Sequence, residues 1–136
     1  MPYLQALLAL GESDTPELIS KIKRGLPFRS CQRFFKETEL PTEITARVIQ
    51  IPMRTLARRK KEGRLRPDES DRLVRLARLY VKALELFGDR ADAARHWLMS
   101  PAHALGGATP LEYSSTEIGA REVENLIGRL EHGIPS

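Results

Sequence analysis

The sequence of 136 residues predicts an all-α protein. Apolar residues recur at the 3.6-residue spacing of amphipathic helices along most of the chain. The alternating β-branched pattern of half-buried strands is nearly absent, and glycine and proline interrupt the periodic segments where short helices would end. We therefore expect an N-terminal helix-turn-helix unit over 1–67, joined by a long central helix to a small C-terminal helical domain, with the second domain spanning 68–136.

Two short helices are expected in the first forty residues, whose opening eleven residues carry little signal. Ser13 or Asp14 can cap a helix from Pro16 to about Arg24. A second helix, over 28–37, has aromatic residues on one side and basic residues on the other. Cys31, the single cysteine, lies on the aromatic side, where a small buried side chain would fit.

A pair of short helices with a very brief turn follows. Thr42 is the expected N-cap of a helix over 43–49, because Pro41 keeps the preceding chain out of the helix. Pro52 suits the first position of the next helix, and Gly63 ends it. Two short helices joined in this way, the second exposed and cationic, are typical of a helix-turn-helix, whose second helix lies in the major groove of DNA.

The second of these helices is strongly basic. Residues 40–67 hold eight Lys or Arg against two Glu, a net charge of +6. Turning Leu56 inward places Arg54, Arg58 and Lys61 on the outward face. Such a stripe is also compatible with an ordinary solvated helix surface, but the turn before it favours DNA binding. We expect Met53, Arg54, Thr55 and Arg58 to face base edges, and Arg59, Lys60, Lys61, Arg64 and Arg66 to meet phosphates.

The central helix should span roughly twenty residues, beginning after Pro67 and ending at Gly88. Carboxylates occupy its first turn, where the helix dipole favours them. Apolar residues cover nearly all of its circumference, leaving a narrow polar strip from Arg75 to Glu85, so it should be buried on several sides. We expect it to contribute to a homodimer interface, as paired half-sites on DNA would require.

The remaining chain is helical and acidic. Asp89 is the expected cap of a helix that reaches about Met99, and Ser115 or Thr116 precedes a last amphipathic helix over 119–132. Residues 105–136 hold five Glu against two Arg, a net charge of −3. A chain that is basic in its middle and acidic at its end suggests two surfaces with two kinds of partner.

The sequence contains no pattern that is typical of a catalytic or metal site. His96, His103 and His132 are widely separated, with no second His or Cys at ligand spacing. Ser114 and Ser115 lack the strand-turn-helix setting of an acyl-transfer nucleophile. We expect neither enzymatic activity nor a cofactor. No apolar run approaches the roughly 20 residues of a membrane span, so we expect a cytoplasmic protein without a membrane partner.

Several stretches, taken in order, resemble the Xre/MbcA/ParS-type antitoxins. They are Ile51 to Arg59, Glu69 to Leu73, Ala83 to Gly88, Trp97 and Leu98 with Pro101, Ala104 to Gly107 with Thr109 to Leu111, and Gly119 and Ala120 with Val123 and Glu124. The resemblance covers about 42–133. It implies a non-catalytic antitoxin paired with a RES-domain toxin, an enzyme that consumes NAD or transfers ADP-ribose from it.

The resemblance also implies two binding surfaces. The helix-turn-helix would bind the operator of its own operon and repress it, through Arg54, Thr55, Arg58 and Arg59. The C-terminal end would lie in or over the NAD pocket of the toxin, where its carboxylates could pair with basic groups of the toxin. That end comprises Glu131, His132, Gly133, Ile134, Pro135 and Ser136. The alternative is a helix-turn-helix transcriptional regulator without a toxin partner.

Overall fold

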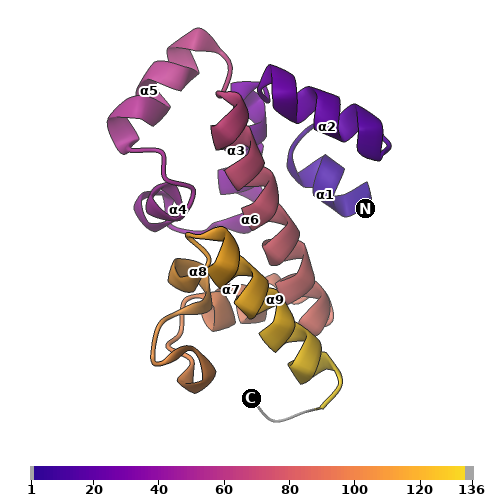
Figure 1. The fold of residues 1–136 in the computed structure, drawn as a ribbon, viewed down its shortest axis with the longest axis vertical. Helices are drawn as coiled ribbons and strands as arrows, with labels where there is room; N and C mark the ends of the chain where they lie inside the picture. Colours follow the sequence, from indigo (N-terminus) through magenta and orange to yellow (C-terminus); the bar gives the residue numbers. More distant parts are fainter. Residues whose placement is uncertain (1, 134–136) are drawn as a thin grey trace. The chain divides into compact units, whose positions relative to one another are not determined.

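The computed structural model describes residues 2–133, which form helices and no strand (Figure 1). The helices are α1 (Pro2–Leu7), α2 (Thr15–Arg24), α3 (Phe28–Thr38), α4 (Thr42–Val48), α5 (Met53–Glu62), α6 (Pro67–Leu86), α7 (Ala91–Leu98), α8 (Pro110–Tyr113) and α9 (Glu117–Glu131), with a short 3₁₀ turn, η1 (His103–Leu105). The predicted all-α class is confirmed. Among these residues, no helix is both long enough and apolar enough to cross a membrane.

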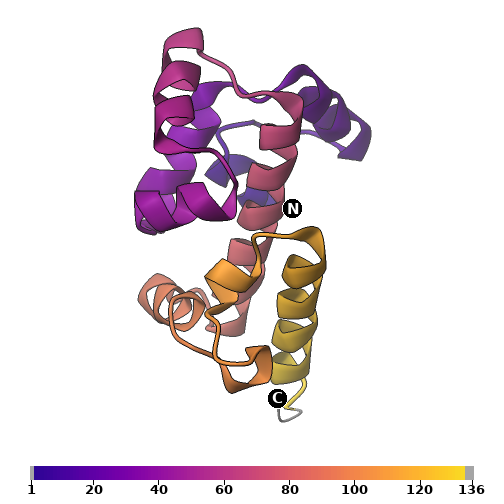
Figure 2. The same ribbon diagram turned by 60° about the vertical axis from the view of Figure 1, so that its left-hand side comes forward.

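The chain forms two compact units, Met1–Ala77 and Arg78–Ser136, which divide within α6 (Figure 2). Because α6 is one continuous helix, its first turns belong to the N-terminal unit and its remaining turns to the C-terminal unit. The division by contacts therefore falls later in the chain than the division after residue 67 that the sequence suggested.

Two helices begin with a capping side chain close to where the sequence predicts their starts. Asp14 accepts a hydrogen bond from the backbone N–H of Glu17 at the start of α2. Thr116 accepts one from the backbone N–H of Gly119 at the start of α9. These bonds satisfy N–H groups that have no partner within the helix, which explains why both helices begin where they do.

Two other expected caps are wrong. Thr42 is the first residue of α4 and makes no capping bond, because the N-cap position is taken by Pro41. Asp89 has a φ of +66°, in the left-handed region, so it belongs to the turn that ends α6. The N-cap of α7 is Arg90, whose side chain makes no capping bond.

The core of the N-terminal unit is built by all its helices except α2. The α1 segment, which carried little sequence signal, buries Leu4 and Leu7, with Leu8 just beyond the helix. Helix α2 has no buried residue: its Leu18 and Ile22 are half-buried and its Ile19 is exposed. Cys31 is fully buried, as predicted, and burial followed by the charge of Glu69 raises its pKa to about 12, so it stays a neutral thiol.

Helix α6 is buried on several sides, as its apolar circumference predicted. The apolar side chains along it lie inside the single chain, and none of its large hydrophobic residues is among the exposed ones. The buried set in this helix is Leu73, Val74, Leu76, Ala77, Leu79, Tyr80, Val81, Ala83 and Leu84. The chain itself therefore accounts for the apolar surface that had suggested a homodimer through this helix.

In the C-terminal unit, α8 and α9 approach each other very closely. A Cβ atom on Gly119 would lie 1.8 Å from the backbone oxygen of Tyr113, so only glycine fits there. Helix α9 buries Val123, Leu126 and Ile127, the face that its periodicity predicted. On its other side, Glu124 accepts hydrogen bonds from two residues of α6, Arg78 at 3.3 Å and Lys82 at 3.4 Å.

Candidate functional site

The turn between α4 and α5 has the tight geometry of a helix-turn-helix. Helix α4 ends at Val48 and α5 begins at Met53, so only four residues separate them. Gln50 supplies the change of direction with a φ of +58°. Ile49 and Ile51 on either side of it are fully buried, which anchors the turn in the core. Two buried isoleucines, Ile49 and Ile51, therefore flank the exposed Gln50 at which the chain turns.

Arg72 of α6 holds this turn in place. Its Nε donates to the backbone oxygen of Ile49 at 2.6 Å, and its Nη2 donates to that of Gln50 at 3.4 Å. Its Nη1 also pairs with Asp68 one turn earlier at 3.3 Å. Burial would raise the pKa of Asp68, but the bond and charge of Arg72 outweigh it and lower the pKa. Only the i, i+4 spacing between Asp68 and Arg72 is local in the sequence.

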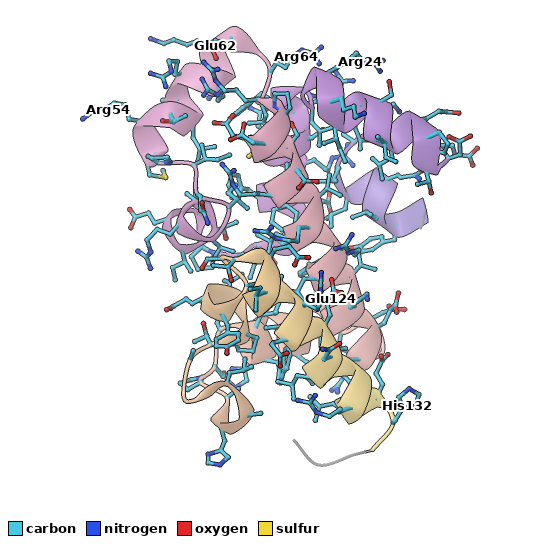
Figure 3. The ribbon with its side chains drawn as sticks, in the orientation of Figure 1. Arg24, Arg54, Glu62, Arg64, Glu124 and His132 are labelled. Carbon is cyan, nitrogen blue, oxygen red and sulfur yellow. The ribbon has the colours of Figure 1, made fainter. Side chains whose placement is uncertain are left out.

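Helix α5 presents the basic stripe that its sequence predicted. Leu56 is buried, while Arg54, Arg58 and Lys61 on the opposite face are exposed. Figure 3 shows Arg54 projecting outward from α5. Of the other residues proposed for DNA contact, Met53, Lys60, Arg64 and Arg66 are exposed and Thr55 is half-buried. Met53 is 49% exposed, so a large apolar side chain lies beside the stripe.

Arg59 does not belong to this exposed face, contrary to the expected phosphate contact. Its side chain is only 4% exposed, and its guanidinium is bound to Glu69 of α6. The Nε–Oε1 distance is 2.8 Å and the Nη2–Oε2 distance is 3.1 Å. Its Nη1 donates to the exposed Glu62 at 3.1 Å. Arg59 follows Leu56 by three residues and so shares its inward face, which the composition of a basic helix conceals.

In the buried pair of Arg59 and Glu69, each charge is compensated by its partner. Glu69 Oε1 also accepts the backbone N–H of Arg66 at 2.8 Å, three residues before it, as in a capping box. Burial would raise the pKa of Glu69, but the bonds from Arg59 and Arg66 outweigh it and lower the pKa. The bond to Glu69 raises the pKa of Arg59 further. Both groups stay charged, so the pair fixes α5 against the start of α6.

The C-terminal end of α9 is exposed throughout the part that the structure describes. Glu131 is the last residue of the helix, His132 is its C-cap, and Gly133 follows with a φ of +72°. Figure 3 shows His132 at this end of α9. Ile134, Pro135 and Ser136, the other residues of the expected toxin-binding end, lie outside the described residues.

The C-terminal unit also exposes apolar side chains that the sequence did not single out. Ile118 is 78% exposed in the first turn of α9, and Tyr113 and Met99 are 38% and 37% exposed. Trp97 is half-buried, with its ring centroid 6.3 Å from that of Phe87. Ile118 does not lie on the face of α9 that carries Val123 and Ile127. Helical periodicity alone could therefore have predicted that its side chain is exposed. Across residues 2–133, His, Cys, Asp and Glu form no cluster that could hold a metal ion.

Comparison with known proteins assigns both parts of the chain to one kind of protein. Residues 17–78 match the family model described as the antitoxin Xre-like helix-turn-helix domain. Residues 82–133 match the model of the antitoxin Xre/MbcA/ParS C-terminal toxin-binding domain. The first match contains α4, α5 and the turn between them, and the second contains α7, α8 and α9.

Curated relatives named antitoxin Xre align with most of the chain. The protein from Yersinia enterocolitica is 37% identical over 128 residues, which are 93% of this chain and 86% of the relative. The protein from Photorhabdus laumondii is 35% identical over 125 residues, 91% of this chain and 84% of the relative. A third relative, from Pseudomonas putida, is 37% identical over 84 residues, 61% of this chain and 52% of its own length. The chain therefore belongs to the Xre family of antitoxins, as a helix-turn-helix protein with a toxin-binding domain, and is not an enzyme.

Proposed function

We propose that this antitoxin neutralises a RES-domain toxin by covering the NAD site of that enzyme. The observation that carries the proposal is the match of 82–133 to a toxin-binding domain, because it assigns the partner class to a defined part of the chain. The RES identity of the toxin rests on the resemblance to Xre/MbcA/ParS-type antitoxins. In this proposal the end of the chain, from Glu131 to Ser136, lies in or over the pocket.

The physical case for this end rests on its charge and its exposure. Glu131 and His132 extend from the end of α9 without a covering element, so a partner can reach them. The carboxylate of Glu131 would pair with cationic groups that otherwise hold the phosphates of NAD. Ile134 and Pro135 would add apolar contact inside the pocket.

We further propose that the helix-turn-helix binds the operator of its own operon and represses transcription. The exposed stripe on α5 supports this proposal, since Arg54 and Arg58 are the side chains best suited to bidentate contact with guanine. Lys60, Lys61 and Arg64 would contact phosphates. Arg59 has no such role, because its guanidinium is buried against Glu69.

Two further features belong to the proposal. Both partners, a toxin and operator DNA, are encountered in the cytoplasm, where we place the protein. Pairing of two copies on a two-fold operator would have to use a surface other than the apolar side of α6, whose residues are buried within one chain. The alternative of a regulator without a toxin leaves the toxin-binding domain without a purpose.

Co-expression tests the proposal directly. The reading frame next to this one should arrest growth when it is expressed alone, and the full chain should restore growth. The chain with Arg54→Ala and Arg58→Ala should restore growth equally well when both genes are transcribed from foreign promoters, because neutralisation does not need DNA binding. A harmless neighbour, or a failure of the full chain to rescue, would refute the antitoxin function proposed for this pair.

A further inference from the structure

A second basic surface lies at the end of α2, apart from the stripe on α5. A polar depression of about 220 Å³ is lined there by residues of α2, α3 and the connection between α5 and α6. No acidic side chain contributes to it. Its cationic lining residues are Lys21, Arg24, Arg29 and Arg64.

Backbone pairing builds this depression from segments that are distant in the sequence. Pro27 and Arg64 form an isolated antiparallel bridge. The N–H of Phe28 donates to the oxygen of Gly63, and the N–H of Leu65 donates to that of Leu26, both at 2.9 Å. The connection between α2 and α3 is therefore joined to the connection between α5 and α6, and their side chains have fixed neighbours.

Gly25 permits this close approach. It has a φ of +87°, and a Cβ atom at this position would lie 2.2 Å from the backbone oxygen of Leu65. Arg64 Nη1 donates to the oxygen of Gly25, which turns the guanidinium toward the end of α2. Arg24 and Arg64 lie near one another at this place in Figure 3. The cations are thus brought together by the backbone and not by chance extension of surface side chains.

The charges in the depression are not neutralised within the described part of the chain. Lys21, Arg24, Arg29 and Arg64 form no ion pair there. Lys21 donates to Ser13 Oγ and to the backbone oxygen of Leu10, and Arg24 donates to Ser20 Oγ. These acceptors are uncharged, and an Arg fork offers five N–H donors, so several donors remain for an anion.

Helix dipoles do not cancel this charge. The C-terminus of α2 contributes roughly −0.5 of an elementary charge, and the N-terminus of α3, which begins at Phe28, contributes roughly +0.5. The two ends meet at Gly25 and Pro27, so their effects largely offset each other. Four full positive charges then dominate the local field.

We propose that this depression binds a backbone phosphate of DNA, outside the groove that α5 occupies. The inference rests on the proposed DNA binding by α5 and adds a contact that the recognition helix cannot make. The source of the phosphate is inferred from the connectivity: Gly63 alone separates Arg64 from the end of α5, and Lys60 and Lys61 in the last turn of α5 are exposed. The contact reads no sequence and fixes the position of the protein on the duplex.

Salt dependence of binding tests the site with a charge-matched control. Arg24→Gln with Arg29→Gln removes two exposed cations of the depression, while Arg33→Gln with Lys36→Gln removes two exposed cations of α3 that do not line it. The probe is a duplex of about 30 base pairs, three helical turns, selected from a random pool by the full chain. Affinity is measured from low to high salt for the wild type and both variants.

The proposal predicts that Arg24→Gln with Arg29→Gln flattens the slope of log K against log salt by about 1, the loss of one phosphate contact. The affinity should fall by the same factor on the selected duplex and on a scrambled duplex. Trimming the duplex ends should abolish the difference from the wild type. The control variant should keep the wild-type slope, and both should keep the wild-type melting temperature.

A slope and affinity equal to those of the control variant would overturn the phosphate site while leaving DNA binding by α5 intact. A loss confined to the selected duplex would also overturn it, because a phosphate contact is blind to sequence. If the selection enriches no duplex at all, DNA binding by α5 fails together with the phosphate site.

Discussion

The guanidinium of Arg59 in α5 and the carboxylate of Glu69 in α6 face each other through two hydrogen bonds, 2.8 and 3.1 Å long. Both side chains are buried, at 4% and 7% exposure. Such a pair sets the position of one helix on another, because either charge left alone in the interior would be costly. The buried pair of Arg59 and Glu69 therefore holds α5 in the position in which its basic stripe is exposed.

Removing either member of this pair should destabilise the N-terminal unit. Glu69→Ala and Arg59→Ala each leave a buried charge without its buried partner and should lower the free energy of unfolding by about 3–5 kcal/mol. Glu62→Ala, which removes the exposed partner of Arg59, should cost less than about 1 kcal/mol. Urea denaturation measures all three. A Glu69→Ala cost as small as that of Glu62→Ala would contradict the role of the pair.

The same pair predicts an acid-sensitive fold. The pKa of Glu69 is lower in the folded chain than its ordinary value of 4.5. A lowered pKa contributes stability above the unfolded value, and this contribution is lost as the pH falls through the folded pKa. The free energy of unfolding should therefore decline below about pH 4.5, and Glu69→Gln should remove its share of that decline. Asp68→Asn should leave the part of the decline that is due to Glu69. Identical pH profiles for the wild type and Glu69→Gln would exclude this origin.

Two glycines of α9 provide a matched pair for the contact between α8 and α9. Gly119→Ala forces a methyl group against the backbone of Tyr113 and should destabilise the C-terminal unit by about 1–3 kcal/mol or more. Gly128 has open space around its Cβ position, so Gly128→Ala should stabilise the helix by about 0.5–1 kcal/mol. Thermal denaturation compares them. Equal effects of the two substitutions would mean that the close approach at Gly119 is absent.

The outward arginines of α5 should distinguish DNA sequences. Arg54→Ala and Arg58→Ala should each weaken binding to a selected duplex by about 1–3 kcal/mol if they contact guanine edges. Titrations on the selected duplex and on a scrambled one provide the comparison. A similar loss on both duplexes would assign these side chains to phosphates and exclude the base contacts.

Much of this architecture could be read from the sequence, because helix signals are local. The periodicity of α9, the cap at Asp14 and the outward position of Arg54 depend only on neighbouring residues, and the structure agrees with each. The family resemblance, carried mainly by the C-terminal half, agrees with the matched domains.

The features that could not be read depend on distant pairings. Arg59 meets Glu69 only after α5 folds back on α6, so a basic helix read alone assigns it to the surface. The depression at the end of α2 requires the bridge between Pro27 and Arg64, which no short-range pattern reveals. The apolar circumference of α6 suggested a partner copy, although the same chain covers it.

The NAD-consuming activity of the purified toxin, measured with and without this chain, tests the central proposal most directly. An equimolar amount of the full chain should stop NAD consumption. A chain ending at Gly133 should still bind the toxin but should leave NAD consumption largely uninhibited, because it lacks the segment that is proposed to cover the pocket. Undiminished NAD consumption in a stable complex with the full chain would contradict the proposal, and complete inhibition by the shortened chain would contradict the role of its end.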